Sequence, residues 1–172
     1  MIQVRSQAPD FSCNAYLKGN SQPVKVSLAD YRGKWTVLFF YPMDFTFVCP
    51  TELRAFAEAK HEIESLGGTV VAASCDSFYS HLAWFSKDLP EVDYPVLADK
   101  TGEIARKYGI YLENEGISLR GLFIVDPKGV LRYQVVTDLG VGRATEETIR
   151  VLQALQTGAN CPANWKPGQK TL

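Results

Sequence analysis

The sequence predicts an α/β fold in which one mixed β-sheet lies between layers of helices. Between residues 35 and 109, short apolar, β-rich runs alternate with helical patterns, and this alternation is typical of a sheet covered by helices. Two further strand-like runs then flank a tight turn, and one amphipathic helix follows them. With 172 residues, 46% of them hydrophobic, a single domain can bury a full core.

The first predicted unit is a strand, a helix and a second strand. WTVLFFY (35–41) is a continuous apolar run. ELRAFAEAKHEIESL (52–66) repeats apolar residues at helical spacing, and the next two residues, both glycine, are a stop signal. GTVVAASCDS (68–77) is the second apolar run. The three segments together predict a βαβ unit.

The alternation continues after residue 77. FYSHLAWFSKDL (78–89) is predicted as a helix and YPVLAD (94–99) as a short strand. TGEIARKYG (101–109) is predicted as a short helix that Thr101 opens, because threonine is a favoured residue at helix N-termini.

A hairpin and a last helix complete the predicted domain. LRGLFIVD (119–126) and GVLRYQVVTD (129–138) lie on either side of a Pro-Lys-Gly turn, which predicts two antiparallel strands. ATEETIRVLQALQTG (144–158) has Thr145 as the expected N-cap, acidic residues in its first turn and Gly158 at its end. These are the start and stop signals of a helix.

Composition and charge argue against several classes of function. The net charge is −1, and Lys and Arg form no block, so neither nucleic acid nor an anionic membrane is an expected partner. The first ten residues, MIQVRSQAPD, lack the pattern of a signal peptide, which favours a cytoplasmic protein. The two histidines and four cysteines have no metal-ligand spacing, and a lone Gly-Val-Gly at 140–142 predicts a turn. We therefore expect no metal and no other cofactor.

Among the four cysteines, Cys49 has the most informative position. Pro50 follows it, and proline is favoured at the first helical position, so Cys49 lies at the start of the predicted helix. The N–H groups and dipole of a helix N-terminus favour the thiolate, which is the nucleophile. Thr46 can place a hydroxyl beside the sulfur, and Pro42 can wall the pocket without offering an N–H donor. From spacing alone, a buried cysteine that only packs is an equal alternative.

FYPMDFTFVCPTEL (40–53) closely resembles the active-site signature of the peroxiredoxins, in the typical 2-Cys branch that includes the peroxidase subunit of alkyl hydroperoxide reductase. The resemblance covers nearly the whole chain. Its other blocks are APDF (8–11), HLAWFS (81–86), SLRGLFIVDPKG (118–129) and CPANWKPG (161–168). It implies a thioredoxin-like fold with an N-terminal extension, a domain over residues 1–158 and a C-terminal arm over residues 159–172. We expect the arm to be irregular and loosely held, with Trp165 as its anchor.

The resemblance also assigns residues to the active site. The Pro-x-x-x-Thr-x-x-Cys pattern of the family falls on Pro42, Thr46 and Cys49, and its distant arginine falls on Arg120. A fixed guanidinium would stabilise the thiolate and hold the peroxide oxygens as charge moves onto the leaving oxygen. Without the motif, a surface ion pair would be the ordinary interpretation of Arg120.

Two further charged residues match the family pattern around that arginine. Glu52 resembles the glutamate that orients it, and Arg143 resembles a second, outer arginine. The alternative for both is a simple charge at a helix end, since a glutamate is favourable at an N-terminus in any case.

The activity that the resemblance implies is reduction of hydrogen peroxide and organic hydroperoxides. Cys49 would become a sulfenic acid, and Cys161, which matches the resolving cysteine of the family, would form an inter-chain disulfide with it. The implied partners are a second copy of the chain, a decamer of five dimers as the larger assembly, and a thioredoxin-like or flavoprotein dithiol reductant. Cys13 and Cys75 match no catalytic position and are interpreted as packing thiols.

A second hypothesis is a ring-forming structural protein that senses redox state or acts as a chaperone. The Cys49→Ser variant separates the two hypotheses, because a chaperone would still protect unfolding clients and a thiol peroxidase would lose turnover.

Overall fold

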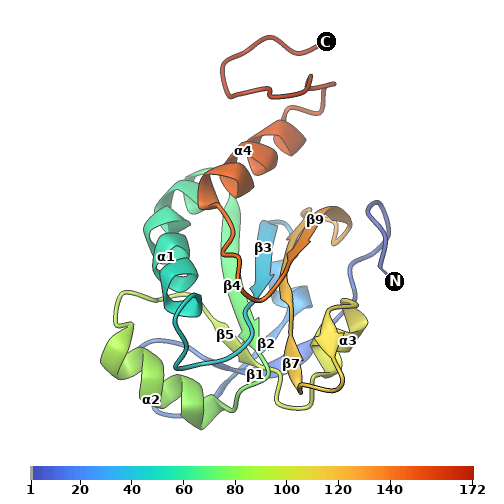
Figure 1. The fold of residues 1–172 in the computed structure, drawn as a ribbon. Helices are drawn as coiled ribbons and strands as arrows, with labels where there is room; N and C mark the ends of the chain where they lie inside the picture. The colour runs from blue at the N-terminus through green and yellow to red at the C-terminus, as the bar shows by residue number, and fades with distance from the viewer. Residues whose placement is uncertain (1) are drawn as a thin grey trace.

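The computed structural model describes residues 2–172 and shows one mixed seven-stranded sheet with helices on both faces (Figure 1). The order across the sheet is β2-β1-β5-β4-β3-β8-β9. Its strands are β1 (Ser12–Tyr16), β2 (Val24–Ser27), β3 (Trp35–Phe40), β4 (Gly68–Ser74), β5 (Val96–Ala98), β8 (Arg120–Val125) and β9 (Leu131–Thr137). A separate small hairpin pairs β6 (Tyr111–Leu112) with β7 (Ile117–Ser118). The predicted α/β class is confirmed.

The strand directions match the two units predicted from the sequence. β4 runs parallel to β3 and to β5, so the βαβ unit is confirmed. β8 and β9 pair antiparallel, so the hairpin is confirmed as well. Its turn is closed by Asp126, whose carboxylate accepts from the backbone N–H of Lys128 and of Val130, each at 2.9 Å. Gly129 has a φ of +80° there, a left-handed conformation that favours glycine.

The helices form two unequal layers. They are the 3-10 turn η1 (Leu28–Tyr31), α1 (Cys49–Ser65), α2 (Phe78–Asp88), α3 (Glu103–Lys107) and α4 (Thr145–Gln156). Side chains of α1, α2 and α4 belong to one core cluster, whereas those of η1 and α3 belong to the other. The sheet therefore separates two cores, with the three longer helices on one face.

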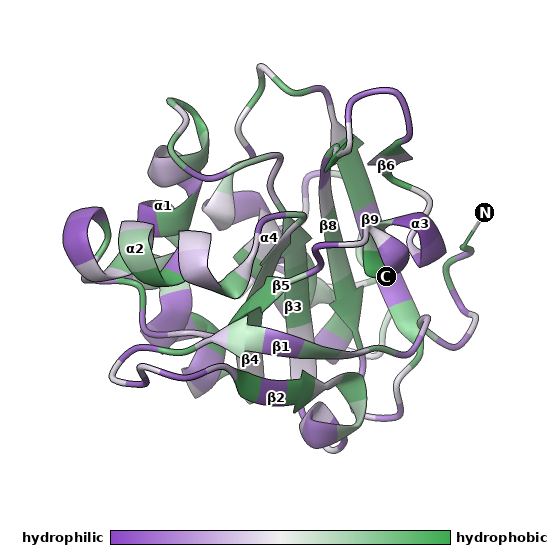
Figure 2. Cartoon of the chain, turned by 90° about the horizontal axis from the view of Figure 1, so that it is seen from below, coloured by the Kyte–Doolittle hydropathy of each residue, from purple (hydrophilic) through white to green (hydrophobic). Residues whose placement is uncertain are grey.

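Strand β3 shows how one apolar run supplies both cores. Val37 and Phe39 pack with the α1–α2–α4 layer, and Leu38 and Phe40 pack with the opposite layer. Successive side chains on a strand point to opposite faces, and a strand covered on both faces reads as a continuous apolar run. Figure 2 shows the consequence: the central strands are hydrophobic, and hydrophilic residues gather on the helices and loops around them.

Both predicted threonine caps are wrong. The N-cap of α3 is Gly102, and the carboxylate of Asp99 accepts from the N–H of Ile104 and of Ala105 at 3.1 and 2.8 Å. Two carboxylate oxygens reach two free N–H groups at once, so Asp99 caps the helix in place of Thr101. At α4 the N-cap is Ala144, with no side-chain cap bond, because the helix already includes Thr145.

Residues 159–172 contain no helix or strand and extend beyond the end of α4, away from the sheet (Figure 1). The irregular tail is confirmed, but it is not loose throughout. Trp165 is only 4% exposed, and its indole Nε1 donates to the carbonyl of Gln169 at 3.0 Å. Arg150 of α4 donates to the carbonyl of Trp165, also at 3.0 Å. Trp165 therefore anchors the tail to α4, as predicted.

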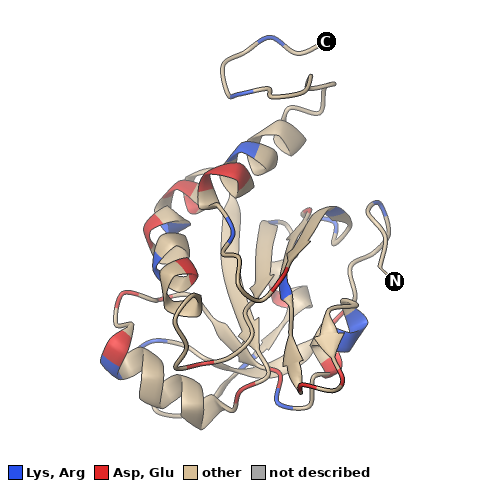
Figure 3. Ribbon diagram, in the orientation of Figure 1, with Lys and Arg blue, Asp and Glu red and all other residues tan. Residues whose placement is uncertain are grey.

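Figure 3 shows Lys and Arg interspersed with Asp and Glu over the helices and loops. None of the helices within residues 2–172 is long and apolar enough to cross a membrane. The same residues contain no group of three or more His, Cys, Asp or Glu side chains that could hold a metal ion.

Candidate active site

Cys49 is the first residue of α1 and follows the connection that joins this helix to β3. Its side chain is buried, and residue exposure is only 1%. The N–H groups of Thr51 and Glu52 donate to the carbonyl of Val48 at 3.0 and 3.4 Å, which closes the first turn around the cysteine. The sulfur thus lies at a helix N-terminus, with Pro50 in the first turn, and the predicted position is confirmed.

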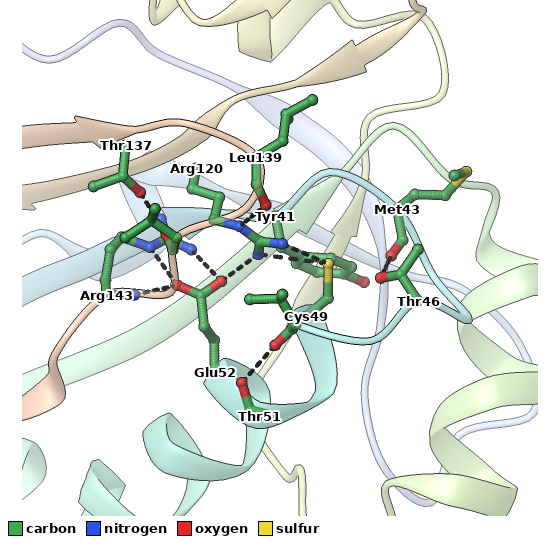
Figure 4. A network of polar contacts seen from close by, with 12 residues as sticks. Tyr41, Met43, Thr46, Cys49, Thr51, Glu52, Arg120, Thr137, Leu139 and Arg143 are labelled. Atoms are coloured by element: carbon green, nitrogen blue, oxygen red, sulfur yellow. Dashed lines mark hydrogen bonds and ion pairs between the residues drawn. The ribbon is translucent and has the colours of Figure 1, made fainter.

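Arg120 brings its guanidinium directly to the sulfur (Figure 4). Its Nη1 and Nη2 atoms are both 3.5 Å from Cys49 Sγ. The arginine is the first residue of β8, the neighbour of β3, and its Nε donates to the carbonyl of Leu139 at 2.8 Å. With its side chain 3% exposed, the guanidinium is fixed and shielded from water. Such a donor pair stabilises a thiolate by charge-assisted hydrogen bonds.

Glu52 holds two arginines at once, one on each side (Figure 4). Its Oε2 lies 2.5 Å from Arg120 Nη1, and its Oε1 lies 2.7 Å from Arg143 Nε. Arg143 also donates through its Nη2 and its backbone N–H, at 3.0 and 2.8 Å. Burial raises the pKa of Glu52, but the hydrogen bonds and charges of Arg143 and Arg120 more than offset this, so the pKa lies below its ordinary value.

The charges of this cluster do not cancel. Two buried guanidinium groups face one carboxylate, which leaves one positive charge in excess. A thiolate on Cys49 would balance it, since an opposite charge at short range favours the ionised form. The cluster is therefore arranged to hold an anion at the sulfur or at an oxygen beside it.

The stability that Glu52 confers should depend on pH. Replacing it (Glu52→Gln) should lower the free energy of unfolding at neutral pH by about 3–5 kcal/mol, the usual cost of breaking a buried ion pair. A depressed folded-state pKa gives stability that is present above the unfolded value of about 4.3 and is lost as the pH falls through the folded value. The difference between wild type and Glu52→Gln in urea unfolding should therefore shrink below that pH.

The matched control is Glu58→Gln, on the exposed face of the same helix. It should stay within about 0.5 kcal/mol of wild type at neutral pH. A difference between wild type and Glu52→Gln that does not change with pH would contradict the role of the carboxylate.

Thr46 and Pro42 lie in the connection between β3 and α1. The hydroxyl of Thr46 donates to the carbonyl of Met43 at 2.9 Å, which leaves its oxygen as an acceptor. Across the described residues, no hydrogen bond joins Thr46 to Cys49. Pro42 is buried and has no N–H to offer. The structure thus joins Cys49, Arg120, Glu52 and Arg143 by direct contacts. Thr46 and Pro42 lie in the connection that precedes Cys49.

Cys161 is far from this cluster within one chain. Its sulfur is 3.5 Å from Thr157 Oγ1 and 3.8 Å from the carbonyl of Ala154. It therefore lies at the C-terminal end of α4, whereas Cys49 lies at the opposite end of the α1–α4 layer (Figure 1). Both are free thiols. A single chain does not bring them together.

Cys13 and Cys75 are held as neutral thiols. Burial, and then the charge of Asp99, raise the pKa of Cys13 to about 11. The same two causes, in the same order, raise the pKa of Cys75 to about 12. Thiols with such values are almost wholly protonated at neutral pH and are weak nucleophiles. Their environments favour the packing role.

Sequence reasoning missed the groups that support the candidate residues. Backbone carbonyls of Leu139 and Gly121 accept from Arg120 and Arg143 at 2.8 and 2.6 Å, and a carbonyl has no signature in a sequence. It also missed a buried contact between Asp44, two positions before Thr46, and His81 of α2. The two residues lie 37 positions apart with no spacing motif, so only the fold reveals them.

Comparison with known proteins gives a consistent result. The model of the AhpC/TSA family matches residues 4–134. The chain is 52% identical to the putative peroxiredoxin YkuU of Bacillus subtilis, over 98% of this chain and 97% of that protein. It is 50% identical to a thioredoxin peroxidase of Echinococcus granulosus, over 96% and 89%. The solved structure of a reduced 2-Cys peroxiredoxin of Plasmodium vivax superposes with a TM-score of 0.92 at 33% identity, over 98% and 91%.

Proposed function

Because this chain belongs to the AhpC/TSA family of peroxiredoxins and is a thiol-dependent peroxidase, we propose that Cys49 is the thiol that attacks the peroxide. One observation carries this proposal: both terminal nitrogens of the buried Arg120 lie 3.5 Å from its sulfur. Cys13 and Cys75, by contrast, have raised pKa values, and within residues 2–172 no hydrogen bond joins either sulfur to a cationic group.

In the first step the Cys49 thiolate attacks one oxygen of the peroxide, in line with the O–O bond. A sulfur–oxygen bond forms, the O–O bond breaks, and the second oxygen leaves as an alkoxide or hydroxide that takes up a proton. Cys49 is oxidised to a sulfenic acid, and the peroxide is reduced to an alcohol or water. The Arg120 guanidinium lies where the negative charge moves from sulfur to oxygen, so it stabilises the thiolate and the leaving oxygen in turn.

We propose that Cys161 of a second chain resolves this intermediate. Its thiol attacks the sulfenic sulfur, water leaves, and an inter-chain Cys49–Cys161 disulfide remains. Because Cys49 is buried in the first turn of α1, that turn has to open before another sulfur can reach it. Local unfolding is then a step of the cycle. A dithiol then returns both cysteines to thiols and leaves oxidised itself.

Exposed apolar side chains next to the site support assembly with further copies. Met43, Phe45 and Phe47 of the β3–α1 connection are 46%, 59% and 93% exposed, and Tyr79 at the start of α2 is 74% exposed. Ser80 of α2 donates to Asp44 of the connection, so the two segments are neighbours. Monomeric proteins rarely expose such apolar patches. We propose a homodimer as the working unit and a decamer of five dimers as the larger assembly.

The proposed reductant is a dithiol protein of the thioredoxin type, with a dedicated flavoprotein as the alternative source of the same chemistry. A relative at 50% identity is named thioredoxin peroxidase, which supports the first. Four free cysteines suit a reducing compartment, and the cytoplasm is therefore our proposed location. Residues 159–172 are proposed as the arm that carries the resolving cysteine, and residues 1–158 as the peroxidase domain.

A non-reducing denaturing gel tests the pair of cysteines. After one equivalent of hydrogen peroxide, wild type should run at twice the chain mass, because the disulfide links two chains. Cys49→Ser and Cys161→Ser should each remain at the mass of one chain, and Cys75→Ser should behave as wild type. If wild type stays monomeric and mass spectrometry finds Cys49 linked within its own chain to Cys13 or Cys75, Cys161 is not the resolving residue.

The chaperone-like or redox-sensing alternative is not favoured by the comparisons, since the relatives are named as peroxiredoxins and peroxidases.

A further inference from the structure

A buried ion pair lies next to the proposed active site and takes no part in the chemistry described above. Asp44 belongs to the β3–α1 connection, and His81 belongs to α2. The distance from Asp44 Oδ2 to His81 Nδ1 is 2.8 Å, and the two side chains are 1% and 0% exposed. Burying two ionisable groups is costly unless each is paired and hydrogen-bonded. The pair therefore calls for an explanation.

Both ring nitrogens of His81 face oxygen atoms. Its Nδ1 faces the carboxylate of Asp44, and its Nε2 faces the backbone carbonyl of Leu97 at 3.3 Å. Both partners accept hydrogen bonds, whereas a neutral imidazole has one donor and one acceptor nitrogen. A lone pair on either nitrogen would point at a partial negative charge. The geometry therefore fits an imidazolium that donates from both nitrogens to a carboxylate and a carbonyl.

Asp44 is held by more than this one bond. Its Oδ1 accepts from the Tyr41 hydroxyl at 2.7 Å, and its Oδ2 accepts from Ser80 Oγ at 2.7 Å. Its backbone N–H donates to Asp76 Oδ2 at 2.9 Å. Tyr41 and Asp76 are the other titratable groups that face the pair, and burial, followed by the charge of Asp44, raises the pKa of both. Tyr41 follows β3, Ser80 belongs to α2 and Asp76 follows β4, so three parts of the fold fix one residue of the connection.

The residue after Asp44 is strained. Phe45 has a φ of +56°, a left-handed conformation that a residue with a side chain rarely adopts because its Cβ crowds the following carbonyl oxygen. Its ring packs on Trp84, with centroids 5.5 Å apart, but it remains largely exposed. Strained backbone persists only where the neighbours hold it, and it gathers at functional sites. Here the strained residue lies between the anchored Asp44 and Thr46.

We propose that Asp44 and His81 form a positioning pair, which holds the β3–α1 connection in the conformation that admits peroxide to Cys49. The inference rests on the proposed role of Cys49. The pair does not touch the reacting atoms and acts through Thr46 and Pro42, each two positions from Asp44. The pair holds the connection in place. The strained backbone at Phe45 favours a different conformation of the connection, which forms once the pair is removed.

Removing either charge has two linked effects. In Asp44→Asn the amide presents donors to the His81 N–H and the Ser80 hydroxyl, and in His81→Gln the carboxylate keeps its charge without a cation. The connection then relaxes at Phe45 and carries Thr46 with it. Reaction of Cys49 with peroxide slows, because the residues that position the peroxide have shifted. Opening of the first turn of α1 speeds up, because the segment before it is no longer held.

The experiment measures two rates at Cys49 in the full-length protein. One is the single-turnover reaction with hydrogen peroxide, and the other is alkylation of reduced enzyme by iodoacetamide, which needs only an accessible thiolate. In Asp44→Asn and His81→Gln, the first rate should fall by about 100-fold, the scale of a misplaced reacting group, while the second rises. The double variant should fall no further, as expected of residues that act as a unit. His61→Gln, which removes the exposed histidine of α1, should leave both rates unchanged.

A second measurement stands even where a variant fails to fold. Nitrogen-15 NMR of wild-type protein, assigned with His61→Gln, should show a proton on each ring nitrogen of His81, because both nitrogens face acceptors. A single protonated nitrogen would overturn the ion pair. Two folded variants with peroxide rates within about twofold of wild type would overturn the positioning role. Neither result would contradict the proposed role of Cys49. That role would be contradicted if wild-type protein formed no sulfenic acid at Cys49.

Discussion

Cys49→Ser is expected to show no peroxide turnover above the uncatalysed background. The thiolate is the nucleophile, and a serine hydroxyl in the same place is neither ionised nor readily oxidised at its oxygen. Arg120 and the helix N-terminus would remain, but they have nothing to activate. The measurement is peroxide consumption with a dithiol reductant in excess, followed over many turnovers.

Cys13→Ser is the matched control for this variant. It removes a thiol whose pKa is raised to about 11. This thiol belongs to β1, the strand next to the edge strand β2. Turnover should stay within about twofold of wild type. Activity that disappears in Cys13→Ser and survives in Cys49→Ser would place the chemistry at a different sulfur altogether.

Arg120→Met is expected to lower the rate of sulfenic acid formation by about 100- to 1,000-fold, the usual loss when one charge-stabilising donor is removed from a transition state. Both of its terminal nitrogens face the sulfur, so the loss removes two donors and one charge. Stopped-flow mixing of reduced enzyme with peroxide measures this step without the later ones.

Arg120→Lys tests whether charge alone is sufficient. A lysine ammonium keeps the charge but cannot reach the sulfur, Glu52 and the Leu139 carbonyl from one rigid plane, as Arg120 does. It should recover only part of the rate. Arg132→Met on β9 controls for loss of a paired surface arginine and should change the rate by less than about twofold. Equal rates for Arg120→Met and wild type would contradict the electrostatic role.

The sequence predicted the parts of the fold whose side chains are buried on both faces or carry strong turn signals. β3 and β4 are continuous apolar runs, and the Pro-Lys-Gly turn marks the β8–β9 hairpin. It did not predict β1 and β2, because SCNAY and VKVS are short and mix polar with apolar residues. They become strands by pairing with each other and with β5, and pairing across a sheet is a tertiary effect.

The candidate site divides in the same way. Arg120 and Cys49, 71 positions apart, were linked through resemblance to a family, and the structure brings them into contact. Their supports were not predictable. Asp44 and His81 are ordinary residues of a loop and a helix until α2 packs against the connection. The cap of α3 depends on which side-chain oxygen lies within reach of its free N–H groups. Contacts of this kind depend on how the elements pack, so the sequence alone does not reveal them.

Two tryptophans are placed so that their fluorescence reports on two different steps of the proposed cycle. Trp84 packs against Phe45 of the β3–α1 connection, with the two rings tilted by 36°, whereas Trp165 is buried in the segment that carries Cys161. The first indole senses rearrangement of the connection, and the second senses departure of the arm from α4. Because Trp35 is a third tryptophan, phenylalanine at Trp35 and at one of these two positions leaves a single tryptophan for each half of the proposed cycle. Oxidation and resolution can then be timed separately, by light the protein itself emits and without any attached label.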